Sequence, residues 1–197
     1  MAHLTFRQAR EEDHAAIVAS IQTWWGETRT PEEARELSLL LPRLFLQHFA
    51  ATSLIVERRP DAEESGAAGG AGPGGAGPGA AAGALAGFLV GFHSPDRPGT
   101  AYIHFVGVHP ELRHQGVARQ LYERFFARAV AAGRQEVRSI VSPANKPSIA
   151  FHHSMGFRPE GGDYESDGVP VHRDYDGPGH DRISFRRVLS APPAPEA

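Results

Sequence analysis

The segment Ala101–Tyr122 most constrains the fold, because it predicts a β-strand that passes through a short turn into a helix. Residues 101–108 are nearly all apolar, aromatic or β-branched, which is typical of a strand buried on both faces. Pro110 ends this strand, and apolar residues then recur at helical spacing from about Gln115. We therefore expect an α/β (α+β) structure in which this strand–turn–helix unit is central.

The turn before the helix is suited to bind phosphate. The first N–H groups of a helix have no intrahelical acceptor, and they carry the positive end of the helix dipole. Small residues at Gly116 and Ala118 let the backbone approach a diphosphate closely. The chain has no GxxxxGK[ST] sequence and no GxGxxG after a strand, which disfavours a P-loop and a Rossmann dinucleotide site.

Two motifs in this region resemble those of one enzyme superfamily. Arg113-x-x-Gly116-x-Ala118 resembles motif A, [RQ]-x-x-G-x-[GA], of the GNAT superfamily of acyl-CoA-dependent N-acyltransferases. Residues 145–157 resemble motif B, N-x-x-[AS]-x-x-[FL]-[YH]-x-x-x-G-F. The two motifs together cover residues 101–157, and their order and separation are strongly specific. The chain is thus identified as similar to N-acetyltransferases that take acetyl-CoA as a co-substrate.

The resemblance implies the GNAT fold, a central, mostly antiparallel mixed sheet of about seven strands flanked by about four helices. Strands are expected at 3–9, 52–57, 85–92, 101–108, 137–141, 157–160 and 181–188. Helices are expected after Glu11, from Pro31 with a kink or split at Pro42, from Gln115, and in motif B.

We expect residues 1–189 to form a single domain. Residues 59–84 are rich in Gly, Ala and Pro and have little to bury, so they are expected to form a mobile insertion in a hairpin. A glycine loop that cradles a nucleotide is the less favoured alternative for this insertion. Residues 190–197 are expected to be a disordered tail.

Composition narrows the possible partners. The chain has no cysteine, so it forms no disulfide or thiolate metal site. Its net charge of −3 lacks the basic character of a nucleic-acid binder, and no apolar run has transmembrane length. The N-terminus does not resemble a secretion signal. We therefore expect a cytoplasmic enzyme that binds neither nucleic acid nor membrane; a homodimer is common in similar enzymes and is left open.

Three histidines at equal intervals invite a metal hypothesis. His104, His109 and His114 are five residues apart. They would fall on a strand, a turn and a helix start, so equal spacing in sequence does not bring them together, and no HExxH sequence accompanies them. We expect no metal.

The resemblance also implies which residues bind acetyl-CoA. In GNAT enzymes the fourth strand offers backbone groups to the pantetheine arm and the acyl carbonyl, the turn of motif A holds the pyrophosphate, and the asparagine of motif B touches the CoA chain. The corresponding positions here are Val106, Gly107, Val108, Arg113, His114, Gln115, Gly116, Val117, Ala118, Arg119 and Asn145, with His152 beside the thioester sulfur.

Three residues are candidates for catalysis. His104 is the candidate base, because an imidazole titrates near neutrality and because the surrounding strand resembles that of the arylalkylamine N-acetyltransferases. Tyr102 is expected on the same strand face. The alternative is that the His104 ring only fills the strand, bonded to a backbone carbonyl. His152 stands where many GNAT enzymes have a tyrosine that protonates the leaving thiolate, and it could instead only hydrogen-bond the sulfur.

The acceptor site is expected between the first two helices and the last strands. By resemblance, Trp24, Trp25, Tyr164 and Tyr175 are its expected walls. The segment 161–180 is rich in acidic residues, which would attract a cationic amine. The alternative for this segment is a solvated acidic loop.

These observations predict an N-acetyltransferase that transfers the acetyl group of acetyl-CoA to a primary amine of a small molecule, by direct attack in a ternary complex. A protein or peptide N-acetyltransferase and a non-catalytic acyl-CoA-binding module are the alternatives. Ribosomal-protein N-terminal acetyltransferases have a catalytic glutamate on the fifth strand, at the position of Ile140 here. A close relationship to that branch is therefore disfavoured.

Overall fold

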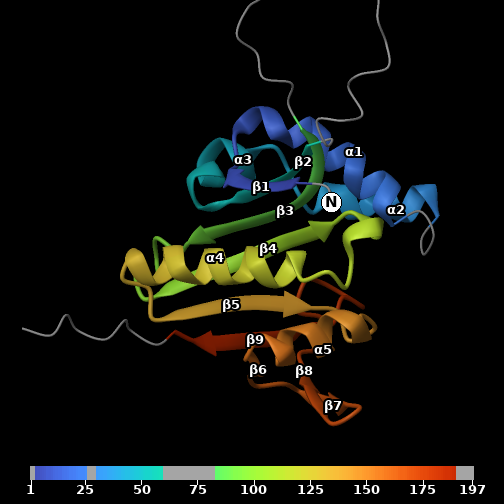
Figure 1. Ribbon diagram of the computed structural model, residues 1–197. Helices are drawn as coiled ribbons and strands as arrows, with labels where there is room; N and C mark the ends of the chain where they lie inside the picture. The colour runs from blue at the N-terminus through green and yellow to red at the C-terminus, as the bar shows by residue number, and fades with distance from the viewer. Residues whose placement is uncertain (1–2, 26–29, 60–82, 190–197) are drawn as a thin grey trace, which may run out of the picture. The chain divides into compact units, whose positions relative to one another are not determined.

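The computed structural model describes residues 3–25, 30–59 and 83–189 (Figure 1). Seven strands of this part form one mixed sheet in the order β1-β2-β3-β4-β5-β9-β6, and two more form a separate hairpin. The strands are β1 (His3–Gln8), β2 (Leu54–Arg59), β3 (Ala84–His93), β4 (Thr100–Val108), β5 (Glu136–Val141), β6 (Arg158–Pro159), β7 (Tyr164–Ser166), β8 (Val169–Val171) and β9 (Ile183–Val188). The α-helices are α1 (His14–Trp24), α2 (Pro31–Leu39), α3 (Leu44–Phe49), α4 (Val117–Ala131) and α5 (Lys146–Ser154). The predicted mixed seven-stranded sheet is confirmed.

The described residues divide into two compact units. Unit 1 comprises residues 1–88 and 106–118, and unit 2 comprises residues 89–105 and 119–197. The strands β3 and β4 and the helix α4 contribute residues to both units. A single domain over residues 1–189 stays a prediction. Nearly all of the predicted insertion 59–84, and the predicted tail 190–197, lie outside the described residues.

Unit 1 contains β1, β2 and the first three helices. β1 pairs antiparallel with β2 along its whole length. The 3₁₀ turn Glu11–Asp13 leads into α1, which buries Ile17, Ile21 and Trp24 on one face. α2 begins with a capping box in which the Thr30 hydroxyl accepts from the N–H of Glu33, and Pro31 occupies the first helical position.

The second predicted helix is split in two. α2 ends at Leu39 and α3 begins at Leu44, with Pro42 between them. Proline has no N–H to donate and its ring clashes with the preceding turn, so a helix cannot run through this position undisturbed. The split was one of the two predicted outcomes, and it accounts for five α-helices where about four were expected.

Unit 2 is built around β5. This strand is parallel to β4 over Thr100–Tyr102 and antiparallel to β9 over its full length. Ser139 of β5 lies opposite Phe185 of β9, and the His152 ring of α5 stacks on Phe185 at 5.0 Å between ring centroids. One face of β5 and β9 therefore carries α5, and Figure 1 shows α4 on the same side. The other face presents the alternate residues of β5.

The helix α4 packs closely on β3. A Cβ atom added to Gly91 would lie 2.6 Å from the Phe125 ring and 2.7 Å from the carbonyl oxygen of Tyr102. Both distances are shorter than van der Waals contact, so a side chain at this position would push α4 away from the sheet.

The segment 161–180 contains a short hairpin where the sequence led us to expect a loop. β7 and β8 pair antiparallel, from Tyr164 opposite Val171 to Ser166 opposite Val169. The two residues between the strands, Asp167 and Gly168, have φ values of 52° and 74°. Positive φ at both central positions is the backbone conformation of a tight hairpin turn, for which Asp-Gly is a favoured sequence.

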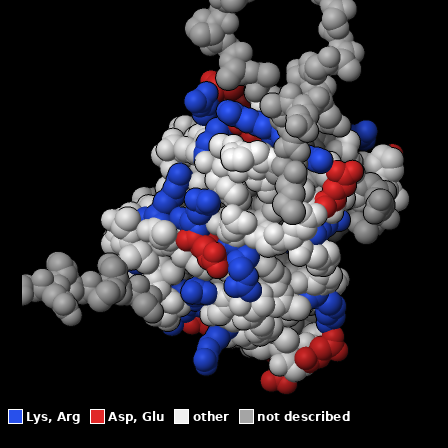
Figure 2. All heavy atoms as spheres, in the orientation of Figure 1, with Lys and Arg blue, Asp and Glu red and all other residues white. Residues whose placement is uncertain are grey.

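Charges are mixed over the face of the molecule that Figure 2 shows. Lys and Arg side chains lie there among Asp and Glu side chains and uncharged residues. Within residues 3–25, 30–59 and 83–189, no helix combines the length and the apolar character that a membrane span requires.

Candidate functional site

The turn of motif A lies in unit 1 between β4 and α4. His109 begins the 3₁₀ turn Pro110–Leu112, residues 113–116 follow, and α4 begins at Val117. His114 and Gly116 have φ values of 62° and 79°. Such reversals of backbone conformation turn neighbouring N–H groups toward one side and form a concave anion site, called a nest. The N–H groups of residues 114–116 donate to no backbone carbonyl in the described part of the chain.

The turn also offers space for a bulky anion. A Cβ atom added to Gly116 would meet nothing within 4 Å. The turn leads directly into α4, a helix of 15 residues, so the partial positive charge of a helix start adds to the unpaired N–H groups. Backbone donors, open space and a helix start together fit a diphosphate. Of the residues predicted to bind the pyrophosphate, His114, Gln115 and Gly116 lie in this turn, and Val117 and Ala118 begin α4. Arg119 lies in unit 2 and faces Glu123 at 3.8 Å.

The Arg113 side chain is engaged with the end of α1. Its Nη2 atom donates to the backbone carbonyl of Trp24 at 2.7 Å, and its Nε atom donates to the carbonyl of Val108 at 3.4 Å. The guanidinium lies 5.9 Å from the centre of the Trp25 ring. These contacts tie the turn to α1, and a role in cofactor binding stays a prediction for this side chain.

The aromatic residues of α1 differ in exposure. Trp24 is only 7% exposed, and its ring stacks on Phe88 at 6.0 Å and meets His109 edge-on at 5.6 Å. Trp25 is half-buried. Trp24 therefore acts as a core residue of unit 1, and its predicted role as an acceptor wall stays untested.

Gly107 has a packing reason to be glycine. A Cβ atom at this position would lie 2.5 Å from the Phe88 ring and 3.1 Å from the Trp25 ring. Val106 and Val108, on either side of it, are half-buried. The absence of a side chain at Gly107 thus lets the Phe88 and Trp25 rings pack against the β4 backbone.

Unit 2 contains a cavity on the face of β4 that Tyr102 occupies. The Tyr102 ring stacks on Phe92 at 5.3 Å with an interplanar angle of 25°. Burial raises the pKa of the Tyr102 hydroxyl above its ordinary value, so it is protonated at neutral pH. The cavity has a volume of about 200 Å³ and is lined by Phe92, Ser94, Arg97, Thr100, Tyr102, Arg138, Ser139, Ile140, Tyr175 and Ser184.

His104 follows Tyr102 by two residues on β4. Side chains two apart on a strand point to the same face, about 7 Å from each other along the strand. His104 is half-buried. Strand alternation thus predicts that two of the three candidate catalytic residues share one face of β4 in unit 2.

Sequence reasoning missed most of this cavity. Of its lining residues only Tyr102 and Tyr175 were predicted to belong to the site; Ile140 was noted only for the glutamate it replaces. Arg97, Arg138 and Ser184 come from a turn and two strands that are far apart in the sequence. The one local signal was the alternation in β5, where Glu136 and Arg138 are polar at positions that share a face.

The predicted tyrosine walls lie in different surroundings. Tyr175 is 51% exposed and lines the cavity. The Tyr164 hydroxyl donates to the carboxylate of Asp181, and Tyr164 is not among the cavity residues.

The acidic residues near these tyrosines are partly neutralised within unit 2. Asp176 pairs with Arg182 at 2.7 Å, and Asp167 pairs with Lys146. These pairs weaken the attraction for a cationic amine that was predicted for the segment.

His152 is enclosed by aromatic rings. It is 4% exposed, and its Nδ1 atom lies 2.8 Å from the carbonyl oxygen of Ser148. Since a carbonyl only accepts, Nδ1 carries the proton and Nε2 accepts from the Tyr122 hydroxyl at 3.4 Å. Burial lowers the pKa of His152, which favours the neutral ring.

The motif B asparagine caps the same helix. The Oδ1 atom of Asn145 accepts from the N–H of Ser148 at 3.1 Å, so the side chain fixes the start of α5. Asn145 is exposed, and its predicted contact with the CoA chain remains a prediction.

The buried His152 should make stability depend on pH. A histidine whose pKa is lowered by folding binds fewer protons in the folded than in the unfolded state. Its contribution to stability is therefore complete above about pH 6.5 and is lost as the pH falls from there toward its folded pKa. We expect the free energy of unfolding to fall more steeply between pH 7 and pH 5 in the wild type than in His152→Phe, measured by urea unfolding at each pH. Equal slopes in the two proteins would contradict this prediction.

The histidines of the metal hypothesis lie in different settings. The His109 ring accepts at Nδ1 from the N–H of Glu111 at 3.3 Å, and His114 is exposed in the turn. In the part of the chain that the structure describes, no three His, Cys, Asp or Glu side chains are grouped so that they could hold a metal ion.

Comparisons with known proteins agree with this architecture. The model of the acetyltransferase (GNAT) family matches residues 41–157. No curated protein sequence matches the chain. Among solved structures, the chain is similar to a putative GNAT acetyltransferase from Desulfovibrio desulfuricans, with a TM-score of 0.63, 21% identity and coverage of 95% of this chain and 100% of that one.

Two further structures share the fold. The ribosomal-protein-S18-alanine N-acetyltransferase of Escherichia coli has a TM-score of 0.58, 16% identity and 99% coverage of both chains. A putative acetyltransferase from Salmonella typhimurium, solved with its cofactor acetyl-CoA, has a TM-score of 0.55, 18% identity and 98% coverage of both chains. The family model covers more than half of the chain, so the chain belongs to the acetyltransferase (GNAT) family and is an acetyltransferase.

Proposed function

We propose that this enzyme transfers the acetyl group of acetyl-CoA to a primary amine of a small molecule, by direct attack within a ternary complex. The cavity of unit 2 carries this proposal. Its volume of about 200 Å³ is below the range of about 300–1,000 Å³ typical of sites for drug-sized ligands, and it suits a compact group rather than a length of peptide.

Acetyl-CoA is the proposed acyl donor. The motif A turn supplies N–H groups of residues 114–116 and a helix start for its pyrophosphate, as described above. By the resemblance stated for the sequence, the backbone of Val106 to Val108 would hold the pantetheine arm. The related structure from Salmonella typhimurium contains acetyl-CoA, which is in keeping with this donor.

The proposed chemistry moves two protons. The ammonium form of the acceptor must lose one proton before its nitrogen can attack the thioester carbonyl, and the nitrogen loses a second as the amide forms. The departing thiolate takes up one proton. His104 is proposed to accept protons from the acceptor, since an imidazole titrates near neutrality. His152 would protonate the thiolate only when its own Nε2 atom is protonated, which its lowered pKa opposes.

The acceptor class is tested by measuring thiol release from acetyl-CoA with a panel of amines, amino acids, aminoglycosides and short peptides, with mass detection of each product. We expect turnover of small-molecule amines. If only peptides are turned over, the acceptor is a protein or peptide and the proposal of a small-molecule acceptor is wrong. Tight binding of acetyl-CoA with no turnover of any acceptor would point to a non-catalytic module.

A further inference from the structure

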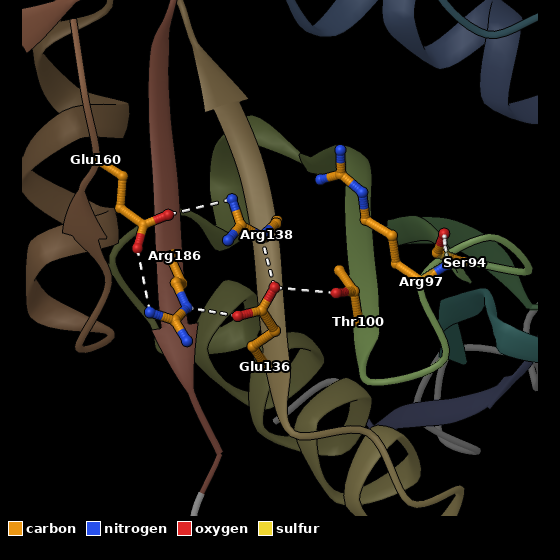
Figure 3. Close-up of polar contacts among 7 residues, drawn as sticks. All are labelled: Ser94, Arg97, Thr100, Glu136, Arg138, Glu160 and Arg186. Atoms are coloured by element: carbon orange, nitrogen blue, oxygen red, sulfur yellow. Dashed lines mark hydrogen bonds and ion pairs between the residues drawn. The ribbon is translucent and has the colours of Figure 1, made fainter.

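The cavity of unit 2 is bordered by a self-neutralised network of four charged side chains. Arg138 donates to Glu136 at 2.6 Å and lies 3.1 Å from a carboxylate oxygen of Glu160. Arg186 donates to Glu160 at 3.2 Å and also to Glu136 (Figure 3). Two positive and two negative charges thus balance one another, so this network by itself leaves no net charge at the cavity.

Glu136 of this network is ionised at neutral pH. Burial raises the pKa of Glu136, but hydrogen bonds from Arg138, Thr100 and Arg186 outweigh burial and lower the pKa to about 2. The Thr100 hydroxyl donates to Glu136 at 2.9 Å. Neither guanidinium of the network can lose its proton near neutral pH.

Arg97 is the cavity residue whose charge is not balanced. Its guanidinium makes no ion pair or hydrogen bond with the residues that the structure describes, and the Nη2 atom of Arg138 donates no hydrogen bond to them. Figure 3 shows the Arg97 side chain extending from the turn before β4 across that strand, and both arginines line the cavity. The cavity thus presents free guanidinium N–H donors and one excess positive charge.

The backbone of Arg97 is held in place by its own turn. The N–H of Arg97 donates to the Ser94 hydroxyl at 3.1 Å, and its carbonyl accepts from the N–H of Thr100 at 2.8 Å. The N–H of Ser94 donates to the carbonyl of Thr100 at 3.0 Å. The turn thus fixes the backbone from which the exposed Arg97 side chain reaches the cavity.

The rest of the cavity offers apolar contact. The stacked rings of Phe92 and Tyr102 and the side chain of Ile140 line it together with the two arginines. A ligand that contacts both the arginines and the apolar lining of the cavity carries an anionic group next to an apolar group. One excess positive charge matches a carboxylate, with a single negative charge, better than a phosphate, whose charge at neutral pH approaches two.

We propose that Arg97, assisted by Arg138, binds the carboxylate of the acceptor, so that the acceptor class is amino acids with an apolar or aromatic side chain. This inference rests on the proposed function. The amine of an α-amino acid is one carbon away from its carboxylate, so a carboxylate held by Arg97 would keep the amine within the same cavity, which Tyr102 lines two residues before His104 on β4. Guanidinium groups bind carboxylates through charge-assisted, often bidentate hydrogen bonds.

The test compares phenylalanine with phenethylamine, which lacks only the carboxylate. We expect the wild type to have the higher kcat/KM for phenylalanine. Arg97→Gln should reduce the ratio of the two kcat/KM values at least about 10-fold, as expected for loss of a hydrogen-bonded charge pair. Arg97→Lys should restore part of the ratio, because it restores the charge without the planar fork.

Arg158→Gln is the matched control. Arg158 is exposed on β6 and does not line the cavity, so the variant removes the same charge elsewhere on unit 2. It should leave the ratio at the wild-type value. An equal fall in Arg97→Gln and Arg158→Gln would overturn the proposal, because the effect would then be one of overall charge.

A second measurement separates this proposal from the proposed function. 3-Phenylpropionate keeps the ring and the carboxylate but has no amine, and its binding is measured by calorimetry without any turnover. If it binds the wild type and loses affinity at least about 10-fold in Arg97→Gln while no amine is acetylated, the carboxylate site stands and the proposed function is wrong. If phenylalanine and phenethylamine are acetylated with a ratio independent of Arg97, the function stands and the carboxylate site is wrong.

Two further results would overturn the carboxylate site at Arg97. One is failure of 3-phenylpropionate to bind the wild type. The other is Arg97-dependent turnover of O-phosphoethanolamine without turnover of phenylalanine.

Discussion

Replacing His104 by alanine is expected to lower the turnover of an accepted amine about 10²-fold or more, with the affinity for acetyl-CoA unchanged. A positioned general base contributes about 10²–10⁴-fold to a proton-transfer step, and alanine removes it. His104 lies on β4 in unit 2, two residues after the cavity residue Tyr102. The measurement is kcat for the best acceptor of the panel, together with the dissociation constant of acetyl-CoA from calorimetry.

Two variants separate catalysis from folding. His104→Gln keeps a polar side chain of similar size but cannot act as a base near neutrality, so it should lose turnover as alanine does. His180→Ala removes an exposed histidine of unit 2 that is absent from the cavity, and its turnover should stay at the wild-type level. Unchanged turnover in His104→Gln and His104→Ala would remove His104 from the mechanism. A loss of turnover accompanied by loss of unfolding cooperativity would assign the residue to packing instead.

The strand–turn–helix unit was predictable because its determinants are local. The run of apolar and β-branched residues that predicted a strand at 101–108 became β4, and the helix expected from about Gln115 begins at Val117. The split of the second helix was predictable for the same reason, since Pro42 acts on the residues of its own turn. Local sterics and periodicity thus fixed the elements that carry both motifs.

The cavity was not predictable from local signals. Arg186 and Glu136, which pair in its bordering network, are 50 positions apart in sequence. Arg97 lies in a turn whose sequence, Ser-Pro-Asp-Arg-Pro-Gly, carries no mark of a binding site. Only strand pairing brings these residues to one face of unit 2, and pairing depends on long-range contacts that a single sequence does not display. The hairpin of β7 and β8 was missed because its strands are only three residues long, although Asp167-Gly168 is a strong turn signal.

In this chain, motif A predicted the backbone conformation correctly but did not predict which groups its arginine side chain contacts. Gly116 has the positive φ that the motif A glycine requires. Arg113 occupies the arginine position of the same motif, yet its guanidinium donates to the end of α1. The acidic residues of the segment 161–180 suggested attraction for a cationic amine, whereas the structure pairs two of them with Arg182 and Lys146 and places Arg97 in the cavity. The charge of a segment therefore did not identify the charge of the site.

Replacing Gly116 by glutamate is expected to lower the affinity for acetyl-CoA at least about 10²-fold. A Cβ atom here meets no protein atom within 4 Å, so the new side chain would enter open space next to the N–H groups of residues 114–116. A carboxylate in that space would compete with the diphosphate for the same N–H groups and repel it. The affinity is measured by calorimetry with acetyl-CoA, at low and at high salt, since the repulsive part should weaken as salt screens it.

Gly133→Glu is the control, because the two glycines share a positive φ and open space around the Cβ position. Gly133 has a φ of 73° and open space around its Cβ position, and it follows the C-terminal end of the same helix. Both variants force a non-glycine residue into the left-handed region, which costs about 1–2 kcal/mol of stability in each. If only Gly116→Glu loses affinity, the loss arises at the diphosphate and not from backbone strain. If both variants bind acetyl-CoA as the wild type does, the motif A turn is not the diphosphate site, and the proposed position of the cofactor is wrong.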